Sequence, residues 1–219
     1  ASFVPTQNGR CCILDLGANL ECDEHNLVQF AIMGSAFSRF LQNIDRPTVG
    51  LLNVGEEDQK GFDYLRAAAE TLRRDDLPVN YVGFVEGSDF SSGTVDVIVT
   101  DGFTGNIALK TAEGVAQLVR AFLRRAFAAN IFTKIAYLFA RPALARVRSM
   151  INPNAYNGAV FLGLNGISVK SHGGTNAFGY ANAIGVAADM VKNGYLPEVS
   201  QAIAKANLIL NEEKRDENG

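Results

Sequence analysis

Four short segments of the chain combine glycine with asparagine, aspartate, lysine or histidine, and each follows an apolar run. They are Gly17–Asn19, Gly55–Gly61, Asp101–Asn106 and His172–Asn176. Glycine lets the backbone approach an anion closely, while amide, ammonium and imidazole groups supply hydrogen-bond donors. Each segment alone is better explained as an ordinary turn, because these residue types are common in turns. Four such segments in one chain indicate an anion-binding protein.

The runs around these segments alternate between patterns typical of buried strands and of helices. We expect strands at 11–15, 48–52, 79–85, 95–100, 159–164 and 167–170, and helices at 24–42, 62–74, 107–128, 177–192 and 198–213. Strand, loop and helix in repetition predict one α/β domain over 1–219, with a mostly parallel sheet and helices on its faces. Ligands of such sheets bind beyond the carboxyl ends of the strands, so the four loops are expected to meet at one edge. None matches a Walker loop or a dinucleotide fingerprint, which disfavours an ATPase or a Rossmann dehydrogenase.

Composition and charge narrow the class of protein further. The chain has 219 residues, of which 47% are hydrophobic and 20% charged, values typical of a globular protein with a sizeable core. The net charge of -3 argues against a general nucleic-acid binder. No acidic residue lies between Glu113 and Asp189, although eight basic residues do. One region is therefore cationic, and the remainder is acidic.

The cysteines and histidines indicate neither a disulfide nor a metal site. Cys11 and Cys12 are adjacent on an expected strand, so their side chains point to opposite faces and do not pair. With Cys22 they are expected to be reduced thiols of a cytoplasmic protein. His25 and His172 are the only histidines, too few beside three cysteines for a structural metal shell. No cofactor or metal is expected.

Four loop motifs together resemble the PlsX-type phosphate acyltransferases of bacterial phospholipid synthesis. The motifs read LDLGAN (14–19), GLLNVGEEDQKG (50–61), VTDGFTGN (99–106) and HGGTN (172–176), and the likeness extends from Ala1 to about Asn211. The resemblance implies a doubly wound α/β fold similar to the isocitrate dehydrogenase and phosphotransacetylase group. It also implies acyl transfer from acyl carrier protein to inorganic phosphate, with the acyl phosphate passing to a membrane glycerol-3-phosphate acyltransferase.

Members of that family begin with a further N-terminal stretch, roughly a third of the full chain, that carries an Asp-Ala-Met-Gly-Gly-Asp type loop. We therefore expect this chain to be the C-terminal two thirds of a longer protein. The alternatives left open are a phosphotransacetylase-like enzyme that uses acyl-CoA, and a non-catalytic module that binds lipid or carrier protein.

The resemblance assigns candidate roles to the loop residues. Lys60 is expected to hold phosphate or the developing oxyanion, although it is equally compatible with a solvated lysine. Asp101 either orients a donor, accepts a proton or caps the next helix. His172 either protonates the leaving thiolate, donates a hydrogen bond or caps a helix. The expected substrate-binding residues are Asn19, Gly102, Gly105, Asn106, Gly173, Gly174 and Asn176.

The cationic region contains two apolar stripes, which we expect to form a protruding amphipathic helical hairpin over 129–152, broken at Pro142. One stripe is Ile131, Ile135, Leu138 and Phe139; the other is Leu144, Val147, Met150 and Ile151; Arg141, Arg146 and Arg148 flank them. Such a hairpin suits an anionic membrane surface or acyl carrier protein. Dimer packing or ordinary core packing explains the stripes as well, and a homodimer is expected.

Overall fold

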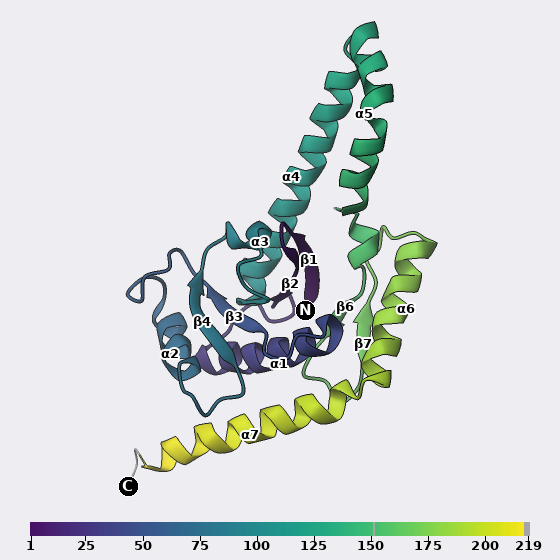
Figure 1. The fold of residues 1–219 in the computed structure, drawn as a ribbon. Helices are drawn as coiled ribbons and strands as arrows, with labels where there is room; N and C mark the ends of the chain where they lie inside the picture. Colours follow the sequence, from purple (N-terminus) through teal and green to yellow (C-terminus); the bar gives the residue numbers. More distant parts are fainter. Residues whose placement is uncertain (151, 217–219) are drawn as a thin grey trace.

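The computed structural model describes residues 1–150 and 152–216 and is built around a five-stranded sheet (Figure 1). Its strands are β1 (Ser2–Thr6), β2 (Gly9–Leu14), β3 (Thr48–Leu52), β4 (Asn80–Val85) and β5 (Val97–Val99). The strand order is β1-β2-β5-β3-β4; β2, β5, β3 and β4 run parallel, and β1 pairs antiparallel with β2. The prediction of a mostly parallel sheet in an α/β fold is confirmed.

Seven α-helices and a second, smaller sheet complete the described structure. The helices are α1 (Glu24–Gln42), α2 (Asp63–Leu72), α3 (Asp89–Ser92), α4 (Gly102–Ala128), α5 (Ile131–Met150), α6 (Ala177–Lys192) and α7 (Tyr195–Asp216). A 3₁₀ turn, η1 (Pro153–Tyr156), precedes β6 (Ala159–Phe161) and β7 (Ser168–Lys170), which pair antiparallel. The prediction that these two strands continue the parallel sheet is wrong, because they form a separate two-stranded sheet. It touches the main sheet at the antiparallel edge, where Val160 and Ala1 exchange backbone hydrogen bonds at 2.8 Å.

The main core lies between the sheet and α1, which α2 and α7 flank (Figure 1). Every α1 residue from Leu27 to Ser38 except Gln29 is buried, as expected for a helix covered on more than one side. Cys12 faces this core, whereas Cys11 joins a smaller cluster on the other face of the sheet. Burial raises the pKa of both thiols, to about 12 for Cys12, so both pack as uncharged apolar groups. The three cysteines are free.

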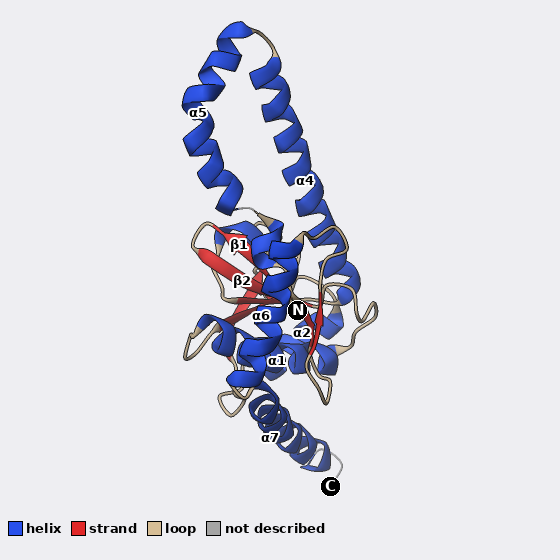
Figure 2. Cartoon of the chain, turned by 90° about the vertical axis from the view of Figure 1, so that its right-hand side faces the viewer, coloured by secondary structure: helices blue, strands red, loops and turns tan. Residues whose placement is uncertain are grey.

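The helices α4 and α5 lie side by side and project from the body of the molecule (Figures 1 and 2). The predicted break at Pro142 is wrong, because α5 continues through this residue. α5 packs along α4, and the rings of Phe127 and Tyr137 meet in an edge contact between the two helices. Ile151 of the second apolar stripe lies outside the described residues. No helix within the described ranges is long and apolar enough to span a bilayer.

Candidate active site

Asp15 organises the loop between β2 and α1. Its buried carboxylate accepts hydrogen bonds from the backbone N–H groups of Gly17, Ala18 and Asn19 at 2.6–3.0 Å, and from the Asn19 side-chain amide at 2.8 Å. Burial alone would raise the pKa of Asp15, but these four donors outweigh it and hold the pKa below its usual value. Asp15 was absent from the predicted site residues. Its place at the end of a strand, four residues before Asn19, is the signal that could have indicated it.

Gly102 and Gly105 let the first turn of α4 pack directly on this loop. The N–H of Gly102 donates to the Asn19 carbonyl at 2.7 Å. A Cβ atom at Gly105 would lie 1.9 Å from the Asp15 carbonyl oxygen, and one at Gly102 would lie 2.4 Å from that of Asn19. Asn106, in the same turn of α4, lies against Gly17. The glycines predicted to bind substrate thus permit a backbone contact that brings Asn19 and Asn106 together.

Asp101 is the N-cap of α4, where its carboxylate accepts a hydrogen bond from the Thr104 N–H at 2.8 Å. The capping role left open by the sequence is therefore present. Burial raises the pKa of Tyr64, and the negative charge of Asp101 raises it further. Tyr64 belongs to the first turn of α2, which follows the loop that carries Lys60.

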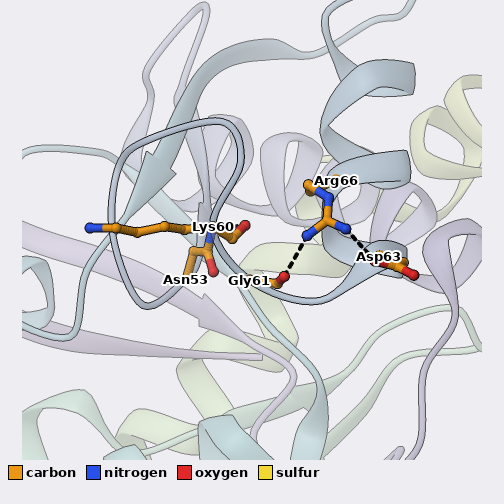
Figure 3. Close-up of polar contacts among 5 residues, drawn as sticks. All are labelled: Asn53, Lys60, Gly61, Asp63 and Arg66. Atoms are coloured by element: carbon orange, nitrogen blue, oxygen red, sulfur yellow. Dashed lines mark hydrogen bonds and ion pairs between the residues drawn. The ribbon is translucent and has the colours of Figure 1, made fainter.

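Lys60 lies in the loop between β3 and α2, at the same carboxyl-end edge of the parallel sheet. Its ammonium forms an ion pair with Glu57 at 2.7 Å and is exposed; this hydrogen bond raises the pKa of Lys60. Asn53 is buried at the end of β3 and donates from Nδ2 to the Lys60 carbonyl at 3.0 Å. Figure 3 shows the Lys60 side chain extended away from Arg66, which bonds the Gly61 carbonyl and Asp63. Lys60 therefore has an accessible charge at this edge.

The fourth loop, 172–176, follows β7 of the small sheet and belongs to a separate polar cluster. The prediction that all four loops leave one sheet is wrong for this loop, since β7 does not pair with the parallel strands. Its hydrogen bonds run to η1, Asn157 and α6. Asn176 caps α6 by accepting from the Gly179 N–H at 3.0 Å. Among the described residues, no hydrogen bond joins His172, Gly173, Gly174 or Asn176 to Asp101 or Lys60.

The residues predicted to contact a membrane or partner all lie on α5. Most of these residues share an exposed position: Ile135, Leu138, Phe139, Arg141, Arg146, Val147 and Arg148 are exposed, and Leu144 is half-buried.

The described parts of the chain contain no group of three His, Cys, Asp or Glu side chains that could hold a metal ion. The backbone N–H groups described at the site around Asp15, Lys60 and α4 are bonded to Asp15, Asn19 and Asp101. The side chains of Asn19, Asn106 and Lys60 therefore carry the donors that an oxyanion would use.

The first prediction concerns the stability that Asp15 contributes. Replacing Asp15 with alanine leaves several N–H donors of the loop without an acceptor, so we expect a loss of about 3 kcal/mol of unfolding free energy. Because the folded pKa of Asp15 is lowered, its contribution is fully present above the unfolded pKa of about 3.9 and is lost as pH falls through the folded pKa. Thermal melts of the parent and Asp15→Asn between pH 6 and pH 3 measure this dependence.

In these melts the Asp15→Asn variant should be less stable than the parent at pH 6 and should lose less stability on acidification. The exposed Asp75, in the connection between α2 and β4, serves as the matched control. Asp75→Asn should follow the parent at every pH. Parallel melting curves for the parent and Asp15→Asn across this range would contradict the role assigned to Asp15.

Comparison with known proteins found one matching family model and several similar proteins. A family model described as fatty acid synthesis protein matches residues 1–197. A phosphate acyltransferase of Rhodospirillum centenum is 56% identical over 210 residues, covering 96% of this chain and 59% of that protein. The corresponding protein of Paramagnetospirillum magneticum is 55% identical over 195 residues, covering 89% of this chain and 56% of its own. That of Rhodospirillum rubrum is 51% identical over 209 residues, covering 95% and 60%. The chain thus spans 56–60% of the length of these relatives.

Proposed function

The chain belongs to the fatty acid synthesis protein family, and we propose that the protein transfers an acyl group from acyl carrier protein to inorganic phosphate. The product is an acyl phosphate, which a membrane glycerol-3-phosphate acyltransferase then consumes in phospholipid synthesis. The observation that carries the proposal is the identity of 56% over 210 residues to a relative named phosphate acyltransferase. For the complete protein we propose the doubly wound fold of the isocitrate dehydrogenase and phosphotransacetylase group, assembled as a homodimer.

In the proposed reaction a phosphate oxygen attacks the carbonyl carbon of the thioester. The new C–O bond gives a tetrahedral intermediate, which collapses with cleavage of the C–S bond. The carrier thiolate leaves with the electron pair and takes up a proton. Phosphate is already an anion at neutral pH, so no strong base is required. Positioning of the phosphate and stabilisation of the oxyanion are therefore the main tasks of the site.

The geometry around the first turn of α4 suits these tasks. The carboxylates of Asp15 and Asp101 are both held by N–H donors. The exposed Asn19 amide gives one of its two N–H groups to Asp15 and keeps the other, and the Asn106 side chain is exposed beside it. Lys60 supplies the positive charge after the neighbouring strand. In the proposed complex, phosphate replaces Glu57 as the partner of its ammonium group. We propose that these three donors hold the phosphate against the N-terminus of α4.

An assay of acyl-phosphate formation tests the proposed function. The longest form of the protein that its gene encodes should form acyl phosphate from acyl carrier protein and phosphate, and much more slowly from acyl-CoA. A faster reaction with acyl-CoA would instead support a phosphotransacetylase-like enzyme. If the intact protein binds acyl carrier protein but forms no acyl phosphate, the proposal of an enzyme is wrong and a binding module is supported.

We propose that the hairpin of α4 and α5 binds an anionic membrane surface, which makes the protein a peripheral membrane protein on the cytoplasmic side. Seven of the eight basic residues in the acid-free segment lie on these two helices, where they are exposed. The apolar side chains between them are exposed as well: Phe139 to 83%, Phe132 to 79% and Leu138 to 64%. Each basic residue near an anionic surface contributes about 1 kcal/mol, and salt weakens this attraction.

Vesicle flotation tests the hairpin proposal. Leu138→Glu with Phe139→Glu should abolish flotation with phosphatidylglycerol vesicles, because two carboxylates replace apolar side chains at the bilayer surface. The melting temperature should be unchanged, since both positions are exposed. Val191→Glu on α6, where the parent side chain is 69% exposed, is the matched control and should float like the parent. Full flotation of the double variant would exclude this membrane surface; a sedimentation analysis would then ask whether α5 packs against a second copy.

A further inference from the structure

Asn157 is a buried amide that joins three segments of the second polar cluster. It is only 7% exposed and follows η1. Its Nδ2 group donates at 2.8 Å to the Ser171 hydroxyl and at 2.8 Å to the Gly179 carbonyl in α6. Its Oδ1 atom accepts from the His172 N–H at 2.9 Å. Nδ2 also lies 3.3 Å from the Thr175 hydroxyl, so one side chain contacts both ends of the glycine-containing loop that carries His172.

The loop itself closes into a tight turn around the His172 ring. The Thr175 N–H donates to the His172 carbonyl at 3.1 Å, and the Gly174 N–H donates to Nδ1 of the imidazole at 3.1 Å. Side chains at Gly173 and Gly174 would meet nothing except the His172 ring itself. Asn157 therefore binds the turn from the buried side. The opposite side of the turn, which carries the exposed His172, faces solvent.

The contact with Gly174 determines which ring nitrogen of neutral His172 carries the proton. A nitrogen that accepts a hydrogen bond from an N–H group has a free lone pair and no proton. Because Nδ1 is that acceptor, the proton of the neutral ring is on Nε2. No acceptor for Nε2 is found among the groups that the structure describes, which leave out the side chains of 151, 153 and 210–219. The exposed ring thus presents an N–H donor that only a ligand or solvent satisfies.

We propose that Asn157 is a positioning residue, which holds the 172–175 turn so that His172 donates a hydrogen bond from Nε2 to an oxygen of the substrate. The inference rests on the proposed function, and the oxygen belongs either to phosphate or to the thioester carbonyl. A neutral donor of this kind stabilises developing negative charge without transferring a proton. It follows that the carrier thiolate takes its proton from another source, and His172 does not act as its general acid.

Replacements of His172 separate hydrogen-bond donation from proton transfer. Glutamine places an amide N–H near the position of Nε2 but cannot act as an acid at neutral pH, whereas asparagine places its amide near Nδ1. In the longest form of the protein, we expect His172→Gln to retain turnover within about tenfold, and His172→Asn and His172→Ala to lose about a hundredfold. If only kcat falls, the acceptor of the His172 hydrogen bond is the thioester carbonyl oxygen. If the KM for phosphate rises, the acceptor is a phosphate oxygen. Equal losses for glutamine and alanine, or no loss for any variant, would overturn the donor role.

Replacements of Asn157 test the positioning role, with Asn182 as the matched control. Asn182 donates to the Asn154 carbonyl at 2.7 Å, so it supports the contact between η1 and α6 without touching the 171–175 loop. Asn157→Ala should lower turnover at least tenfold, while Asn182→Ala should leave it unchanged. Asn157→Asp loses the hydrogen bonds donated to Ser171 and Gly179 and sets a carboxylate against the Gly179 carbonyl, so it should also lower turnover. It serves as the second variant if the alanine variant does not fold. Normal turnover in a folded Asn157 variant would overturn the positioning role.

Nitrogen-15 NMR of the imidazole rings tests the geometry without an activity assay, since the chain has only two histidines. At a pH where the rings are neutral, His172 should show one tautomer, with the proton on Nε2. In Asn157→Ala its two ring shifts should move toward those of the urea-unfolded chain, and in Asn182→Ala they should not. A single Nδ1–H tautomer, or ring shifts that Asn157→Ala leaves unchanged, would overturn the inference. An inactive parent protein with the expected spectrum would instead contradict only the proposed function.

Discussion

Replacing Gly105 with alanine is expected to separate the first turn of α4 from the Asp15 loop. The added Cβ atom would lie 1.9 Å from the Asp15 carbonyl oxygen and 2.8 Å from the Thr100 side chain. Both obstacles belong to well-packed segments, and a backbone oxygen cannot rotate away as a side chain does. The helix must therefore shift by more than an ångström. We expect a loss of about 3 kcal/mol of unfolding free energy, because overpacking of a rigid contact typically costs this much.

The matched control for this prediction lies on the same helix. A Cβ atom at Gly114 would meet nothing within 4 Å, and alanine is favoured over glycine in a helix interior by about 1 kcal/mol. Gly114→Ala should therefore raise the melting temperature while Gly105→Ala lowers it by roughly 6–12 °C. Acyl-phosphate formation should be lost with Gly105→Ala and kept with Gly114→Ala. A Gly105→Ala protein with the stability of the parent would contradict the close contact between α4 and the loop.

Local patterns in the sequence predicted those elements whose ends carry their own capping residues. The bounds of α1 match the prediction because Asp23 caps its first turn, and those of α6 match because Asn176 does the same. The start of α4 was predicted five residues too late, at Ile107 instead of Gly102, because Gly102 and Gly105 read as a loop. Glycine is unfavourable in a helix, but the contact with Asp15 requires it there. Tertiary contact thus outweighed local propensity at the most important helix end.

Pairing between distant segments was harder to predict. β1 was missed because Ser2–Thr6 is short and contains Pro5, which is compatible with a strand only at a sheet edge, the place that β1 occupies. The separate pairing of β6 with β7 was also missed, since a three-residue strand carries no signal for its partner. Asp15 was not among the predicted site residues, for a related reason. Its role depends on four donors that come together only in the folded loop.

Replacing Lys60 with alanine is expected to lower turnover by about a hundredfold, the typical effect of removing one charged donor from an oxyanion site. Lys60 lies in the loop between β3 and α2, where its exposed ammonium pairs with Glu57. Its removal should also raise the phosphate concentration needed for half-maximal rate. The melting temperature should stay close to that of the parent, because the side chain is exposed and its ion pair with Glu57 lies at the surface.

Lys110 provides a matched control, since it pairs with Glu113 at 2.8 Å with the same three-residue spacing as the pair of Lys60 and Glu57. Lys110→Ala should leave both the rate and the phosphate dependence unchanged. Glu57→Gln should act in the opposite direction from Lys60→Ala, because it removes the carboxylate that competes with phosphate for the ammonium. We therefore expect Glu57→Gln to lower the half-saturating phosphate concentration, provided that Lys60 is present. The double variant Glu57→Gln with Lys60→Ala should have the same half-saturating phosphate concentration as Lys60→Ala alone. If the effects of the two single changes add up instead, phosphate does not bind at Lys60.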